Sequence, residues 1–229
     1  MDIFSYTGKG QRKINEDFYA NVKFDESTSL HIVADGMGGY SYGDVAARTA
    51  IEAIVKHLYS KYHEQDAEKI IQESLEIANE QILQKQITLQ AKLGTTIAGV
   101  FIREHTGYAF WLGDVQIYHF RNHVLIFISE SHSLVNEMRK SKVLMNKDIE
   151  RFSSIVTKSL SGNGLTRIPI AKLELSCNDT ISICSDGFYR ENDVDKFICL
   201  SDQKRMESLE NNFQIAKDNY TAIFIGITK

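Results

Sequence analysis

The sequence predicts an α+β protein built as a four-layer α-β-β-α sandwich, in which two antiparallel sheets stack and helices cover their outer faces. First, about ten short segments with strand-like alternation follow one another in consecutive runs, which is typical of antiparallel sheets. Second, two long amphipathic segments come in succession after the third strand, whereas a Rossmann-type fold alternates strands and helices. Each long helix must bury its apolar side on a sheet, and two stacked sheets leave their outer faces for this purpose.

The first part of the chain supplies three strands and both long helices. Alternating side chains between glycines and turns predict strands at residues 2–7, 18–24 and 30–35. Apolar residues at three- and four-residue spacing then predict a helix over 43–59. A second helix should run from Asp66, a suitable N-cap, to about Leu89.

The second part returns to a period of two. It predicts strands at residues 95–102, 107–112, 115–120, 123–128, 170–175, 180–184 and 220–228. Residues 121–122 should form a hairpin turn between two of these strands. Helices are expected at 131–140, 192–200 and 202–211, and residues 141–154 are expected to form a mobile polar loop.

Composition places the chain among ordinary globular proteins. Its 229 residues are 43% hydrophobic, and no linker or internal repeat divides them, so we expect one domain over residues 1–229. The net charge of −4 gives no nucleic-acid footprint. No apolar stretch approaches the ~20 residues of a membrane span, and the first residues lack a signal-peptide pattern. We therefore expect a cytoplasmic protein with no nucleic-acid or membrane partner.

The three cysteines have neither the number nor the spacing of a disulfide framework or a zinc site. They are Cys177, Cys184 and Cys199. We expect free and mostly buried thiols in a reducing cytosol.

The stretch LHIVADGMGGYSYG, residues 30–43, is the first candidate site. An apolar strand ends at Asp35, and Gly36 begins a glycine-rich turn that lets the backbone approach a ligand closely. This arrangement suits a hard cation bound by Asp35 and a nearby backbone carbonyl. The alternative is a strand–turn–helix joint in which the Asp-Gly pair is turn chemistry only.

Four more aspartates share the position of Asp35, at the junction of a strand and a loop. They are Asp17, Asp114, Asp186 and Asp218. Strand ends on one rim of a sandwich can converge, and converging carboxylates raise one another's pKa unless cations neutralise them. Oxygen ligands without Cys/His clusters favour Mg²⁺ or Mn²⁺. Two such ions ~3.5–4 Å apart can activate a bridging water for in-line attack on phosphorus. Arg12 could hold phosphate oxygens bidentately.

Seven motifs in order resemble the successive motifs of the PPM family, and the resemblance covers the chain from about residue 4 to 228. This family comprises the metal-dependent serine/threonine protein phosphatases of the 2C type, and the chain is similar to its compact bacterial members. The motifs are R-x-x-N-E-D (Arg12 to Asp17), A-D-G-M-G-G (Ala34 to Gly39), L-G-T-T (Leu93 to Thr96), G-D (Gly113, Asp114), H-S-L-V (His132 to Val135), S-D-G (Ser185 to Gly187) and D-N-x-T (Asp218 to Thr221).

The resemblance implies hydrolysis of phosphoserine and phosphothreonine on proteins with Mn²⁺ or Mg²⁺, by a metal-bridging water that attacks phosphorus. It implies that Asp35 bridges two ions and that the carbonyl of Gly36 joins the first. It places Asp186 and Asp218 at the second ion. Further acidic positions complete the implied centre: Glu16 and Asp17 close by, partly through water, and Asp114 with Asp186 at a weaker third ion.

Departures from the family pattern leave a second interpretation open. Met37 stands where some members have a histidine that protonates the leaving group, so a metal-bound water must do so here. Val115-Gln116 replaces the usual Ser-Arg, and Ser131 replaces an aspartate. The replacements at positions 115, 116 and 131 favour a pseudophosphatase that binds a kinase or phosphoprotein without turnover. The intact metal carboxylates favour the enzyme. A third interpretation is another binuclear phosphohydrolase acting on a small phosphate ester.

The expected partners are phosphorylated proteins, either a Ser/Thr kinase or its targets, and a monomer is expected. Other conspicuous residues have structural interpretations. We expect His31 and His119 to be packed or surface residues and not ligands, Trp111 to belong to the core, and His132 to support a loop. Asn15 and Asn219 should hold turns through side-chain-to-backbone bonds.

Overall fold

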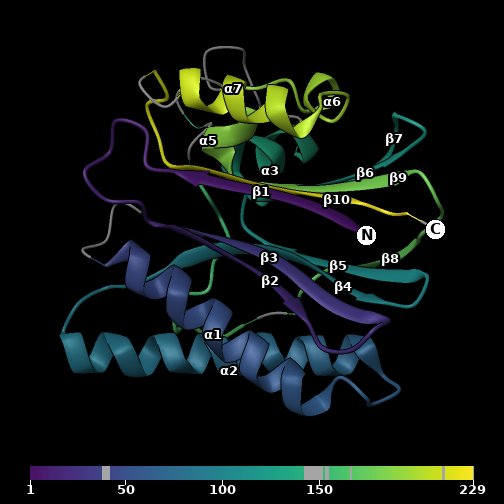
Figure 1. Cartoon of the computed structure of the whole chain (residues 1–229). Helices are drawn as coiled ribbons and strands as arrows, with labels where there is room; N and C mark the ends of the chain where they lie inside the picture. The colour runs from purple at the N-terminus through teal and green to yellow at the C-terminus, as the bar shows by residue number, and fades with distance from the viewer. Residues whose placement is uncertain (38–41, 142–151, 153–154, 166, 213–214, 229) are drawn as a thin grey trace.

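Two five-stranded antiparallel sheets lie face to face, and helices cover the outer face of each (Figure 1). The computed structural model describes residues 1–37, 42–141, 152, 155–165, 167–212 and 215–228. The first sheet has the order β1 (Asp2–Gly8), β10 (Tyr220–Gly226), β9 (Asp179–Cys184), β6 (Gln116–Arg121), β7 (Val124–Ile128). The second has the order β2 (Asp17–Lys23), β3 (Thr28–Gly36), β4 (Thr95–Arg103), β5 (Thr106–Leu112), β8 (Ile170–Glu174).

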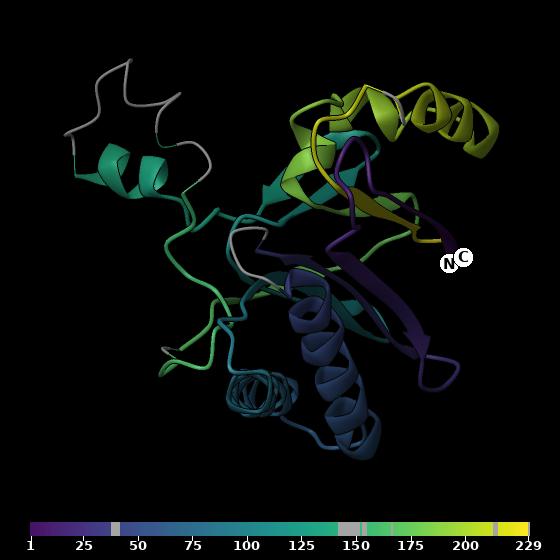
Figure 2. The same cartoon turned by 90° about the vertical axis from the view of Figure 1, so that its left-hand side faces the viewer.

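The helices lie on opposite sides of this pair of sheets. The long helices α1 (Gly43–Lys61) and α2 (Ala67–Leu89) cover the second sheet. The short helices α5 (Asp186–Tyr189) and α6 (Val194–Phe197) and the longer α7 (Asp202–Asn212) cover the first. Helix α3 (Leu134–Lys140) projects beside the sandwich (Figure 2). The predicted α-β-β-α sandwich is therefore confirmed.

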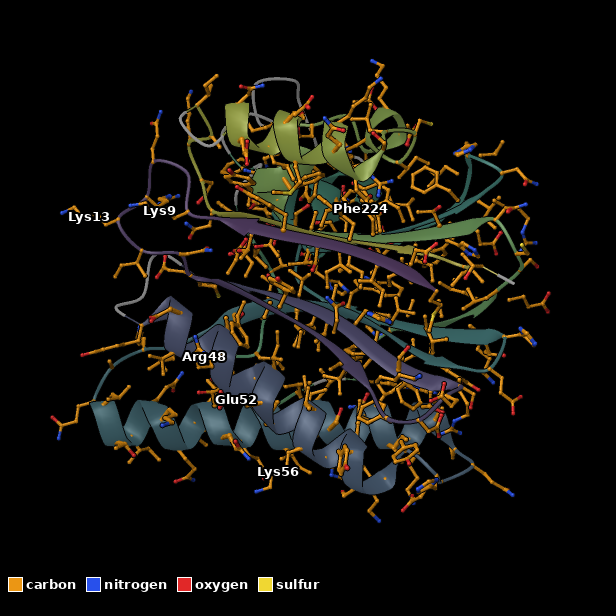
Figure 3. All side chains as sticks on the ribbon, viewed as in Figure 1. Lys9, Lys13, Arg48, Glu52, Lys56 and Phe224 are labelled. Atoms are coloured by element: carbon orange, nitrogen blue, oxygen red, sulfur yellow. The ribbon has the colours of Figure 1, made fainter. Side chains whose placement is uncertain are left out.

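Three apolar layers hold the four structural layers together. Ile54 and Ile71 belong to the layer between the second sheet and the long helices. Trp111 belongs to the layer between the sheets, as predicted. Phe224 points from β10 toward the short helices (Figure 3), where its ring lies 5.8 Å from that of Phe188 and 5.1 Å from that of Phe197. On the opposite side, Arg48, Glu52 and Lys56 follow one another along α1 (Figure 3).

Most predicted boundaries agree with the structure to within one or two residues. The predicted hairpin turn lies one residue later, at Asn122 and His123, whose φ angles of 49° and 64° suit a two-residue hairpin turn. Two predicted helices are shorter, because 131–140 begins at Leu134 after the N-cap Ser133 and 192–200 is reduced to α6. Most of the predicted mobile loop, residues 142–151 and 153–154, lies outside the described residues.

Residues predicted to be structural are mostly so. His31 and His119 are buried, and His119 Nε2 lies 2.9 Å from Asp179 Oδ2. The prediction for the cysteines is wrong in part: all three are free, but only Cys184 is buried, whereas Cys177 and Cys199 are exposed. Exposure follows from position, because Cys177 lies in the turn before β9 and Cys199 follows the short helix α6. In the described part of the chain, no helix combines the length and apolarity needed to cross a bilayer.

Candidate active site

Strand pairing brings the predicted aspartates to one rim of the sandwich. Asp17 at the start of β2 is the direct antiparallel partner of Asp35 near the end of β3. Asp114 follows β5 at the same edge of the second sheet. In the first sheet, Asp186 follows β9 and Asp218 precedes β10, its antiparallel neighbour. Five positions that are far apart in the sequence therefore converge.

A cavity of about 360 Å³ opens at this rim. Seven of the eight predicted site residues line it: Arg12, Glu16, Asp35, Gly36, Asp114, Asp186 and Asp218. Asp17 does not line the cavity and is buried beside it. The loop that carries Arg12 also carries Lys9 and Lys13 at this end of the molecule (Figure 3).

Close backbone packing fixes Asp35 and Gly36. The hydroxyl of Thr95 donates to the Asp35 carbonyl oxygen at 2.8 Å, and the Gly36 amide donates to the Glu16 carbonyl oxygen at 3.1 Å. A Cβ on Gly36 would lie 2.3 Å from the Gly43 carbonyl oxygen, so only glycine fits between the strand end and α1. Gly187 is equally confined, because its Cβ would lie 2.0 Å from the Asn219 carbonyl oxygen.

Burial and mutual repulsion make the carboxylates costly to ionise in the protein alone. Burial, followed by the charge of Asp17, raises the pKa of Asp35 well above its usual range. Burial raises the pKa of Asp17 to about 7, and hydrogen bonds to its carboxylate only partly oppose this. Burial and the neighbouring Asp186 raise the pKa of Asp114 to about 6. A bound cation would reverse these shifts, because it favours the charged forms.

One buried oxygen at the centre has no hydrogen-bond partner. Asp17 Oδ2 accepts from the Ser185 hydroxyl at 2.9 Å, but Asp17 Oδ1 has no partner among the described atoms. An unpartnered buried carboxylate oxygen is costly unless a cation or water satisfies it. Together with an all-oxygen donor set, this atom shows that the residues present fit Mg²⁺ or Mn²⁺.

The carboxylates surround the cavity without converging on one point. Within the described residues, no three His, Cys, Asp or Glu side chains already form a set of metal ligands. Asp218 Oδ2 lies 2.9 Å from Arg12 Nη2, and Asp186 Oδ2 lies 3.0 Å from Arg190 Nη2. In the protein alone, Asp186 and Asp218 are thus each paired with a guanidinium through one carboxylate oxygen while they line the cavity.

Side chains around the centre fasten its loops. His132 Nδ1 accepts from the Gly113 amide at 3.2 Å, so this histidine supports the loop of Asp114, as predicted. Asn15 Oδ1 accepts from the Asp17 amide at 3.2 Å. The Asn219 side chain donates to the Lys9 and Ile14 carbonyl oxygens and accepts from the Glu16 amide. Both asparagines thus hold turns, in agreement with the prediction.

Three side chains that contact the carboxylates or their loop have no role predicted from the sequence. Ser185 bonds Asp17, the Tyr189 hydroxyl donates to the Asp114 carbonyl oxygen at 3.1 Å, and Arg190 pairs with Asp186. The available signal was their position, because Ser185 opens the S-D-G motif and Tyr189 and Arg190 follow it within about one helical turn.

The residues that depart from the family pattern lie in different places. Met37 lines the cavity and has no proton to donate. Val115 is fully buried in the layer between the sheets, and the Gln116 side chain accepts from the Tyr118 hydroxyl. Neither Val115 nor Gln116 lines the cavity, so these two substitutions leave its lining unchanged.

Comparisons with a family model and with curated proteins point to the same family. The model of the protein phosphatase 2C family matches residues 9–220. The serine/threonine phosphatase stp of Listeria monocytogenes is 25% identical over 235 residues, which cover 96% of this chain and 93% of that protein. The protein phosphatase PhpP of Streptococcus pneumoniae is 26% identical over 82% of this chain and 78% of its own length.

Solved structures agree in fold. The serine/threonine phosphatase PstP of Mycobacterium tuberculosis superposes with a TM-score of 0.85 at 18% identity, over 100% of this chain and 99% of that chain. A structure of the PstP catalytic domain in complex with two manganese ions superposes with a TM-score of 0.83, at 18% identity and over 100% and 98% of the two chains. The chain therefore belongs to the protein phosphatase 2C family, the metal-dependent protein serine/threonine phosphatases.

Proposed function

We propose that the rim cavity is the active site at which this chain removes phosphate from phosphoserine and phosphothreonine in proteins. The observation that carries the proposal is the convergence of four aspartates on one cavity, beside a fifth with an unpartnered buried oxygen. Such a cluster is unfavourable in a protein unless cations neutralise it, and oxygen ligands select Mg²⁺ or Mn²⁺.

Asp35 would be the central metal ligand, since β3 lies between the strands that carry Asp17 and Asp114, and since burial and the charges of the other four aspartates of the cluster raise its pKa. The Gly36 carbonyl would join Asp35 in holding one ion, and Asp186 and Asp218 would hold another. Glu16 and Asp17 would lie close to the ions and contact them partly through water. When bound, the ions supply a nucleophilic water at neutral pH and polarise the phosphoryl oxygens.

Arg12 is the proposed phosphate-orienting residue. Its side chain is 50% exposed at the cavity, and its guanidinium can donate two N–H groups to two phosphoryl oxygens. In the protein alone, Arg12 Nη2 pairs with Asp218, so a bound phosphate would share or replace this partner. Met37 has no proton to give, so the leaving alkoxide takes its proton from a water molecule in the cavity.

Phosphoserine and phosphothreonine in proteins are products of Ser/Thr kinases, so we propose that the substrates include such a kinase or its targets. We also propose that residues 1–229 act as one domain and as a monomer, since the chain supplies every proposed ligand and the site needs no second copy to be complete. The free cysteines fit a reducing compartment, and we propose the cytoplasm.

The decisive test uses the purified chain after exhaustive chelation, with Mn²⁺ added back. Phosphate release is measured from phosphoserine, phosphothreonine and phosphotyrosine peptides and from p-nitrophenyl phosphate. We expect release from the first two peptides only when Mn²⁺ or Mg²⁺ is present. Tight phosphopeptide binding without release would support the pseudophosphatase. Hydrolysis of small esters alone would support the third interpretation.

A further inference from the structure

Arg190 is a cation built into the acidic side of the cavity. It lies four residues after Asp186, so one turn of α5 places the two side chains side by side, with Nη2 3.0 Å from Asp186 Oδ2. The side chain of Arg190 is 38% exposed, whereas that of Asp186 is only 15% exposed. Arg190 lines the same cavity as Asp114, and its charge also interacts favourably with Asp114.

The surrounding structure holds Arg190 at this position. Phe188, next but one in the same helix, is fully buried in the layer beneath α5. The Tyr189 hydroxyl donates to the Asp114 carbonyl oxygen and so links α5 to the loop of Asp114. Arg190 is the C-cap of α5, and its backbone amide donates to the Asp186 carbonyl oxygen, so its backbone position is fixed next to Asp186.

We propose that the Arg190 guanidinium takes the place of an additional metal ion between Asp114 and Asp186 and thereby limits the centre to two ions. The inference rests on the proposed function, because it assumes that metal ions bind among the same carboxylates. The predicted third metal site would then be weak because of Arg190. Val115 and Gln116 do not line the cavity and so do not account for that weakness.

The physical reason is competition between a tethered cation and a free one. A guanidinium is protonated at every relevant pH and can occupy carboxylate oxygens bidentately. A divalent ion between Asp114 and Asp186 must displace it and then remain close to its positive charge. Arg12 approaches the centre from the β1–β2 loop and pairs directly with Asp218, whereas its interaction with Asp186 is one of charge without an ion pair.

The test counts Mn²⁺ ions bound to the full chain by isothermal titration and by electron paramagnetic resonance of free Mn²⁺, after chelation. We compare wild type, Arg190→Gln, Arg190→Lys and a control, Lys69→Gln. The control removes another helical i,i+4 pair, Lys69 with Glu73 at 3.8 Å, on α2. Wild type, Arg190→Lys and the control should bind two ions. Arg190→Gln should bind a third at least tenfold more tightly than wild type does, since changes beside a metal ligand typically alter affinity ~10–100-fold.

A second variant and a second readout keep the inference falsifiable. Adding Asp114→Asn to Arg190→Gln should abolish the third ion. Metal-free Arg190→Gln should also melt at a lower temperature than wild type, because two carboxylates lose their counter-charge.

Equal Mn²⁺ stoichiometry and affinity in wild type and Arg190→Gln would overturn the inference and leave the proposed function standing. A third ion bound by wild type at micromolar Mn²⁺ would overturn it even if Arg190→Gln does not fold. Absence of Mn²⁺ binding in every variant would overturn both.

Discussion

Replacing Asp17 with asparagine should stabilise the metal-free protein, although we propose that Asp17 belongs to the active centre. The folded protein raises the pKa of this carboxyl from its ordinary 3.8 to about 7, mainly through burial. Keeping Asp17 ionised above pH 7 therefore costs about 4 kcal/mol of folding free energy, at ~1.4 kcal/mol for each unit of pKa. Asparagine removes this cost. Its buried amide is incompletely paired, however, and this destabilises the folded protein by about 1–3 kcal/mol. The net expected gain is about 1–3 kcal/mol at pH 8.

The sign of the pH dependence follows from the same shift. Because the folded pKa of Asp17 lies above the unfolded one, the folded state binds more protons between about pH 4 and pH 7. The stability of the wild type should fall as pH rises through this window, and Asp17→Asn should lack this part of the decline. The difference between the two proteins should thus be small or reversed at pH 4 and largest at pH 8.

The assay is thermal and urea unfolding of chelated wild type and Asp17→Asn at pH 4 and pH 8, with the exposed Asp2→Asn as control. For a chain of this size, the expected gain at pH 8 corresponds to a rise in Tm of roughly 2–10 °C. Added Mn²⁺ should stabilise the wild type more than the variant. A variant less stable than wild type at pH 8, or a difference that does not change with pH, would refute the reasoning.

Three further variants test separate parts of the structure. Arg12→Ala should raise KM for a phosphopeptide roughly tenfold and leave Mn²⁺ affinity intact, as titration calorimetry can show; loss of metal binding would make Arg12 structural. Asp179→Asn should lower the free energy of unfolding by about 2–4 kcal/mol, because it leaves Arg121 and His119 without their shared buried carboxylate, and urea unfolding measures this. Phe224→Ala should cost about 3–5 kcal/mol in the same assay, and a loss below 1 kcal/mol would contradict its place between β10 and the short helices.

Local patterns predict the elements of this fold because each pattern has one physical cause. The change from a period of about 3.6 to a period of two marks where α2 ends and β4 begins. The hairpin turn was misplaced by one residue, since it depends on which two residues adopt positive φ, and both Arg121-Asn122 and Asn122-His123 fit the spacing. Exposure of Cys177 and Cys199 depends on tertiary position, which no local pattern contains.

The candidate site was predictable as a set of residues but not as a geometry. Strand ends identified the aspartates, yet the sequence does not give the register that places Asp17 opposite Asp35. It also does not give the burial that leaves Asp17 Oδ1 without a partner. Arg190 is visible only once α5 is known, because its pairing with Asp186 depends on a single helical turn.

The central claim is that Asp35 organises a metal centre that hydrolyses phosphoprotein substrates. The most direct measurement is phosphate release from a phosphothreonine peptide by chelated wild type and Asp35→Asn over a range of Mn²⁺ concentrations, with circular dichroism to verify folding. Wild type should be inactive without metal and active with it, and folded Asp35→Asn should be inactive at every concentration, because the shared ligand charge is lost. Activity of Asp35→Asn within tenfold of wild type, a barrier difference of only ~1.4 kcal/mol, or full activity of wild type without metal, would contradict the account.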